Sequence, residues 1–105
     1  MKIFSILKVN DQLQDFTNQA LSEFSDSFPA VTKLKLQDKK ISVKYKKALT
    51  RLREQIKQYR RHNNIGFLKK IKLIRIITAG IESYGYEQDI QQHLIKNITY
   101  FISSN

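Results

Sequence analysis

Apolar residues that recur three and four positions apart restrict the fold of this chain more than any other feature. A helix has about 3.6 residues per turn, so residues with this spacing line one face of it. The first such stretch follows Asn10 and Asp11, whose side chains suit a helix cap, and it ends at Pro29, which has no amide hydrogen to continue a helix. Its apolar positions are Leu13, Phe16, Ala20, Leu21, Phe24 and Phe28. We predict an amphipathic helix here.

The same spacing returns in the middle of the chain, from about Val43 to Arg61. The apolar positions are Tyr45, Ala48, Leu49, Leu52, Ile56 and Tyr59. We interpret the two tyrosines as core side chains, with stacking on nucleic acid bases as the lesser alternative. Asn63, Asn64 and Gly66 follow and are typical of a turn, so a second helix is predicted to end there.

Two further helices are predicted in the last third of the chain. The stretch from Phe67 to Tyr84 is apolar on most of its circumference after Leu73, which is typical of a helix buried in the centre of a fold or in a subunit contact. Its β-branched isoleucines keep a strand open as an alternative. Gly85 ends this segment, and Glu87 and Asp89 place acid in the first turn of a last helix. The apolar positions of that helix are Ile90, Leu94, Ile98, Phe101 and Ile102.

Residues 31–43 allow two interpretations. Apolar and polar side chains alternate near both ends of this stretch, which predicts a short β-hairpin near residues 33–43. The stretch equally suits an extended linker that leads into a helix capped by Ser42. We favour the linker, because an isolated two-stranded ribbon is only marginally stable in water.

The expected fold class is all-α, a small helical bundle of about four helices that forms a single domain over residues 1–105. The chain has no cysteine, which excludes a disulfide framework and a thiolate metal site and agrees with a reducing compartment. The first nine residues, in which Lys8 interrupts an apolar run, do not resemble a signal peptide. The stretch from Ile71 to Ile81 is far shorter than the roughly 20 residues that span a bilayer. We therefore expect a cytoplasmic protein and no membrane partner.

The positive charge of the chain is concentrated in its middle. The formal net charge is +10, although both ends of the chain are mildly acidic. Sixteen of the 19 basic residues lie between Lys33 and Arg75, together with only two of the 9 acidic residues. Charge of one sign at this density repels itself, and an anionic partner relieves the repulsion. The distribution favours a surface that binds a polyanion over a face that is merely solvated.

The basic residues of the central segment are the candidate nucleic-acid-binding residues. On a helical projection five of them group on the side opposite the apolar face, where they suit phosphates spaced along a strand. These five are Lys46, Arg53, Lys57, Arg60 and Arg61. Three more flank the other edge of the apolar face, and three begin the next helix, where we expect them to converge with the first set into one patch. These six are Lys44, Lys47, Arg51, Lys69, Lys72 and Arg75.

No catalytic or metal-binding pattern is found in the sequence. His62 and His93 are the only histidines, and they lie on different segments without a carboxylate pair at ligand spacing. The three glycines match neither a phosphate-binding loop nor a dinucleotide fingerprint. Glu87 and Asp89 are two positions apart, which directs them away from each other on a helix. We expect a protein that is not an enzyme, uses no cofactor or metal, and has His93 as a packing residue.

In size, charge and predicted helical content, the chain is similar in kind to the small helical subunits of CRISPR effector complexes, which line nucleic acid in a larger assembly. The resemblance is one of class and assigns no residue. No helix-turn-helix, ribbon or zinc pattern indicates base reading. We expect a non-catalytic protein that contacts the DNA or RNA backbone regardless of sequence, as a homo-oligomer or as a small subunit of a nucleoprotein assembly. The main alternative is an interaction module or inhibitor that docks on an acidic protein, and a weaker one is attachment to anionic membrane.

Overall fold

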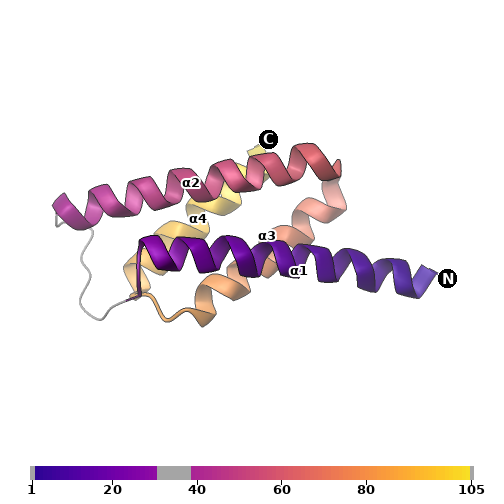
Figure 1. The fold of residues 1–105 in the computed structure, drawn as a ribbon, viewed down its shortest axis with the longest axis horizontal. Helices are drawn as coiled ribbons and strands as arrows, with labels where there is room; N and C mark the ends of the chain where they lie inside the picture. Colours follow the sequence, from indigo (N-terminus) through magenta and orange to yellow (C-terminus); the bar gives the residue numbers. More distant parts are fainter. Residues whose placement is uncertain (1, 31–38, 105) are drawn as a thin grey trace.

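Four helices make up the part of the chain that the computed structural model describes, residues 2–30 and 39–104, with side chains described from residue 12 onward. They are α1 (Lys2–Ser27), α2 (Lys39–Asn63), α3 (Phe67–Ser83) and α4 (Gln88–Ser104). α1 and α2 run side by side in opposite directions, and α3 and α4 lie behind them (Figure 1). No strand occurs in these residues, so the all-α prediction is confirmed for them.

One core holds the four helices together. α1 packs on α2 and α3, and α4 packs on the same two helices. In α1, α2 and α4 the buried apolar side chains fall at the predicted three-and-four spacing, so the predicted apolar face is the side that each of these helices turns to the core. The buried residues of the core are Leu13, Ala20, Leu21, Phe24, Phe28, Tyr45, Ala48, Leu49, Leu52, Ile56, Leu73, Ile77, Ile81, Tyr86, Ile90, Leu94, Ile98 and Ile102. Their burial is the main favourable contribution to folding in a chain without disulfides.

An aromatic cluster closes one end of the bundle. Phe28, just past the end of α1, stacks on Tyr86 from the turn between α3 and α4, with ring centroids 5.9 Å apart. Phe24 and Tyr45 complete the cluster, with their centroids 6.4 Å apart in an edge-on arrangement. The Tyr86 hydroxyl donates a hydrogen bond of 2.5 Å to the Phe28 carbonyl oxygen, which lies where a helix end leaves acceptors without intrahelical partners. The cluster thus joins α1, α2 and the α3–α4 turn.

α1 begins earlier than the capping signals predict. Its first residue is Lys2, so Asn10 and Asp11 lie inside the helix and the predicted cap is wrong. Asparagine and aspartate side chains cap a helix only where the residues before them are not helical. The identity of Asn10 and Asp11 does not show whether the residues before them are helical. The predicted end is confirmed, because Ser27 is the last helical residue and Pro29 follows two positions later.

α2 also begins earlier than predicted, and this excludes the second strand of the predicted hairpin. Residues 39–43 are helical, so the hairpin prediction is wrong there and Ser42 is not a cap. The physical reason is register: Ile41 packs against the core in line with the apolar face of the helix, whereas Val43 is 53% exposed. Residues 33–38, the rest of the predicted hairpin, lie outside the described residues.

The predicted ends of α2 and α3 are confirmed, with one difference in detail. The residue that adopts the left-handed conformation after α2 is Asn64 (φ 51°), not Gly66, and after α3 it is Gly85 (φ 77°). Asparagine and glycine tolerate this conformation better than other residues do. Glu87 precedes α4, so Asp89 is the one of the two predicted acids that lies in its first turn.

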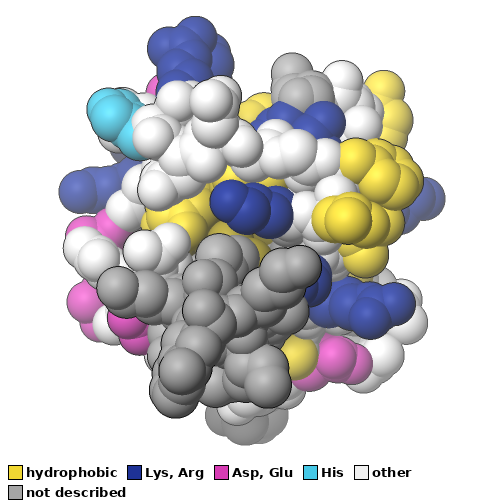
Figure 2. All heavy atoms as spheres, turned by 90° about the vertical axis from the view of Figure 1, so that its right-hand side faces the viewer, with side chains coloured by type: hydrophobic (Ala, Val, Ile, Leu, Met, Phe, Trp, Pro, Cys, Tyr) yellow, Lys and Arg dark blue, Asp and Glu magenta, His cyan; other side chains and the backbone are white. Residues whose placement is uncertain are grey.

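α3 is a surface helix and not the buried central helix that its composition predicts. Its buried residues are Leu73, Ile77 and Ile81, because α3 has neighbours on two sides and its outer side faces solvent. In its first turn Phe67 and Leu68 are each 74% exposed. Figure 2 looks at the end of the molecule where α2 gives way to α3, and it shows hydrophobic side chains at the surface there. The alternative, that this helix takes part in a subunit contact, stays a prediction.

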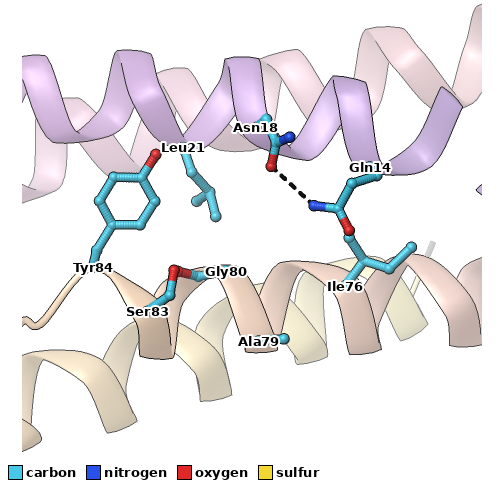
Figure 3. Close-up of a pocket in the computed structure, with 8 residues that line it drawn as sticks. All are labelled: Gln14, Asn18, Leu21, Ile76, Ala79, Gly80, Ser83 and Tyr84. Atoms are coloured by element: carbon cyan, nitrogen blue, oxygen red, sulfur yellow. Dashed lines mark hydrogen bonds between the residues drawn. The ribbon is translucent and has the colours of Figure 1, made fainter. Parts of the chain in front are cut away.

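α1 and α3 approach each other closely at Gly80. A β-carbon at this position would lie 2.5 Å from Leu21 Cδ1, so the lack of a side chain sets the spacing of the two helices. Figure 3 shows Gly80 facing Leu21 across this seam, beside a hollow of about 410 Å³. Thr17 lies in the same seam and is fully buried, and its hydroxyl has no hydrogen-bond partner among the described residues.

We expect Thr17→Val to stabilise the protein. Valine has the shape of threonine without the hydroxyl, so it removes the desolvation cost of a buried polar group without a partner. The free energy of unfolding, measured by urea denaturation, should rise by about 1 kcal/mol. Thr17→Ser is the control, because it keeps the hydroxyl and removes a methyl group, and it should lower the same quantity. A decrease with Thr17→Val would mean that the hydroxyl is hydrogen-bonded in the folded protein.

The buried tyrosines predict a loss of stability at alkaline pH. Burial raises the pKa of Tyr86 to about 12 and raises the pKa of Tyr45 above its ordinary value as well. The ordinary pKa of a tyrosine, which applies to the unfolded chain, is 10.0. A group whose pKa is higher in the folded chain contributes its full stability below that pH and loses it as the pH rises towards the folded pKa, here about 12. The urea midpoint should therefore fall across this range, and it should fall less in Tyr86→Phe. An equally steep fall in that variant would contradict the assignment.

Candidate nucleic-acid interface

The basic residues on one flank of α2 line a groove between α2 and α4, which we call the α2/α4 groove. It has two hollows, of about 460 Å³ and about 400 Å³, at successive places along α2. The first is lined by Ser42, Tyr45, Lys46, Leu49, Thr50, Arg53, His93 and Asn97. The second is lined by Lys57, Arg60, Arg61, Asn64, Ile65 and Phe101.

Five of the predicted residues therefore share the α2 wall of this groove: Lys46, Arg53, Lys57, Arg60 and Arg61. At a rise of 1.5 Å per residue, the line from Lys46 to Arg61 is about 22 Å long. Arg53 and Arg60 are partly buried, and the other three are exposed. The prediction that the five lie opposite the apolar face is wrong. They lie beside it, next to α4, because they line hollows that they share with His93, Asn97 and Phe101 of that helix.

The wall that α4 contributes has a different character. His93, Asn97 and Phe101 are spaced four residues apart, so they follow one another along the side of α4 that faces α2. The His93 ring packs edge-on against Tyr45, and its Nδ1 lies 2.7 Å from the Tyr45 hydroxyl oxygen. His93 thus has the packing contact that was predicted, although its side chain is also exposed to solvent. The sequence analysis did not identify these three residues as one wall of a groove. Their four-residue spacing places them on one side of a helix but does not say which other helix that side faces.

The two tyrosines of the α2 apolar face belong to the core. Tyr45 is 2% exposed, and burial raises its pKa against the smaller opposing effect of the Arg53 charge. Tyr59 is half-buried and stacks on Phe16 of α1, with ring centroids 4.2 Å apart. Tyr45 is part of the buried core and Tyr59 packs against it, so the predicted core role is confirmed.

The remaining predicted residues lie outside the groove. Three are exposed on the flank of α2 away from α4: Lys44, Lys47 and Arg51. Three are on α3 and line neither hollow: Lys69, Lys72 and Arg75. α3 turns away from α2 and packs on α1 and α4, so the predicted single patch is not formed in this groove. Figure 2 shows basic side chains distributed around this end of the molecule.

The end of the groove nearest Arg61 has a second electrostatic role. Arg60, Arg61 and His62 occupy the last turn of α2, where positive charge complements the negative end of the helix dipole. His62 also contacts the Gln58 carbonyl oxygen through Nδ1 at 2.8 Å. Part of the charge at this end therefore supports the helix itself, whereas Lys46, Arg53 and Lys57 lie further from the helix end.

In the described part of the chain, no group of three or more His, Cys, Asp or Glu side chains is placed to hold a metal ion. None of the helices in residues 2–30 and 39–104 combines the length and the apolar character needed to cross a bilayer. The expectation that the protein is not an enzyme stays a prediction.

Comparisons with protein-family models, with curated proteins and with solved structures found no match for this chain. What the chain does has to be inferred from its own residues, and the α2/α4 groove brings five of the predicted binding residues together.

Proposed function

We propose that this chain is a non-catalytic nucleic-acid-binding protein that holds the phosphate backbone in the α2/α4 groove. The observation that carries the proposal is the line of five cations along one wall, from Lys46 to Arg61. Its length of about 22 Å is enough to span several phosphates of one strand.

The electrostatics of the α2 wall favour an anionic ligand. Arg53 and Lys57 are four residues apart, as are Lys57 and Arg61, and like charges at this spacing on a helix repel each other. In the described part of the chain, none of these three side chains forms an ion pair with a carboxylate. A phosphate between two cations replaces their repulsion with attraction, and its binding releases counterions into the solution. Such contacts position a protein on nucleic acid without reading its bases.

The proposal includes a role within an assembly, either with a second copy or as a small subunit. Phe67 and Leu68 are each 74% exposed, and Ile71 is exposed one turn later on the same helix. When neighbouring apolar side chains that face solvent contact another protein, their surface is removed from water and the free energy of the system falls. The same observation supports the second candidate function, an interaction module whose groove cations face the carboxylates of an acidic partner.

Replacing Lys46, Lys57 and Arg61 together with glutamine is expected to weaken binding to nucleic acids of unrelated sequence about equally. All three side chains are exposed, so the helix content should stay unchanged. The slope of log affinity against log salt is negative, and each lost phosphate contact makes it shallower by about 0.9 for duplex DNA or about 0.7 for a single strand. The loss of three contacts should therefore make the slope shallower by between about 2 and about 3. Anisotropy titrations of labelled oligonucleotides over a salt series measure this change.

The matched control replaces Lys44, Lys47 and Arg51 with glutamine. It changes the same residue types on the same helix and alters the net charge equally, but its side chains lie on the flank away from the groove. The control should keep most of the salt slope. Equal losses in the two variants would mean that only overall charge is sensed. An unchanged slope in the groove variant would reject phosphate binding in the groove and leave the acidic protein partner as the better candidate.

A further inference from the structure

The two walls of the α2/α4 groove differ in chemistry. The α2 wall carries cations, whereas the α4 wall carries His93, Asn97 and Phe101. Tyr100 lines neither hollow, but it is seven positions beyond His93 and so lies on the same side of α4, next to this wall. Its side chain is 73% exposed. One wall therefore suits phosphates, and the other offers flat rings.

The core does not account for the exposed rings on α4. Tyr100 lies on the side of the helix away from the buried Ile98 and Ile102, so its ring contributes little to the burial that stabilises the fold. The exposed ring of His93 is held in place by Tyr45, whose hydroxyl oxygen lies 2.7 Å from Nδ1. Seven residues separate Tyr100 from His93, which is about two helical turns, or about 10 Å, along the same side of α4. Rings at this separation meet different bases of one strand.

Resting on the proposed function, we propose that the groove binds single-stranded nucleic acid, with the phosphates along α2 and the bases stacked on Tyr100 and His93 of α4. A single strand can turn its unpaired bases to one side and its backbone to the other. In a duplex the bases face each other, and only the phosphates reach the groove. Stacking of a base on an aromatic side chain contributes about tenfold in affinity and tolerates any base. The groove therefore selects strandedness and not sequence.

The first test compares Tyr100→Ala with the parent protein, using a labelled oligothymidylate and a duplex of equal length. The single-strand affinity should fall about tenfold, and the duplex affinity should change less than about twofold. Tyr100→Phe keeps an aromatic ring and should keep the single-strand affinity. Because the side chain is 73% exposed, the helix content of both variants should match the parent's. An equal loss for both oligonucleotides, or no loss for the single strand, overturns the proposal.

The second test looks for the stacking contact itself. The chain has no tryptophan, so Tyr100→Trp places a single indole on the side of α4 that carries His93. A base stacked on the indole quenches its fluorescence, so adding oligothymidylate should lower the emission. Phe67→Trp is the matched control, because Phe67 is 74% exposed and begins α3, a helix that contributes no residue to either hollow. Equal quenching at both positions, or none at position 100, overturns the proposal.

The two proposals can fail separately. If the variant of Lys46, Lys57 and Arg61 loses affinity for both oligonucleotides while Tyr100→Ala binds like the parent, phosphate binding in the groove stands and the selection of single strands is rejected. If the variant of the three cations binds like the parent, the proposed function itself is rejected, whatever the outcome at Tyr100.

Discussion

The packing of α2 between α1 and α4 is the constraint on which the rest of the structure depends. Its apolar face is wide enough to meet α1 along one edge and α4 along the other. Because α4 covers the edge next to Lys46, Arg53 and Lys57, these cations line a groove and do not stand on an open helix surface. A line of charge with a second wall beside it can hold an extended ligand on two sides, and a solvated helix face offers only one.

The core also places the second wall. Phe28 and Tyr86 close one end of the bundle, and Tyr45 packs into the same cluster. The Tyr45 ring is buried, yet its hydroxyl oxygen reaches Nδ1 of His93 at the groove. A side chain that stabilises the core therefore also fixes the position of a ring on the α4 wall. This arrangement links the packing at the closed end of the bundle to the chemistry of the proposed binding surface.

The sequence predicted the features that depend on a spacing repeated along a helix. It did not predict the features that depend on the surroundings of one residue, such as a helix cap. The apolar spacing identified the buried side of α1, α2 and α4, including Tyr45 on α2. The cap expected at Asn10 and Asp11 was wrong because a capping side chain acts only at a helix end, and the helix already begins at Lys2. The burial of Tyr86 was missed because it depends on Phe28, which is distant in the sequence and adjacent only in the folded chain.

The sequence by itself determined the all-α class, the buried side of α1, α2 and α4 and the concentration of positive charge on α2, because periodicity and charge are properties of neighbouring residues. Only the tertiary structure decided which flank of α2 faces another helix. In the sequence, a basic residue beside an apolar face can equally be one that faces open solvent or one that faces a neighbouring helix. The choice was made by contacts such as Tyr45 with His93, which are 48 residues apart in the sequence and meet because the core brings α2 and α4 together.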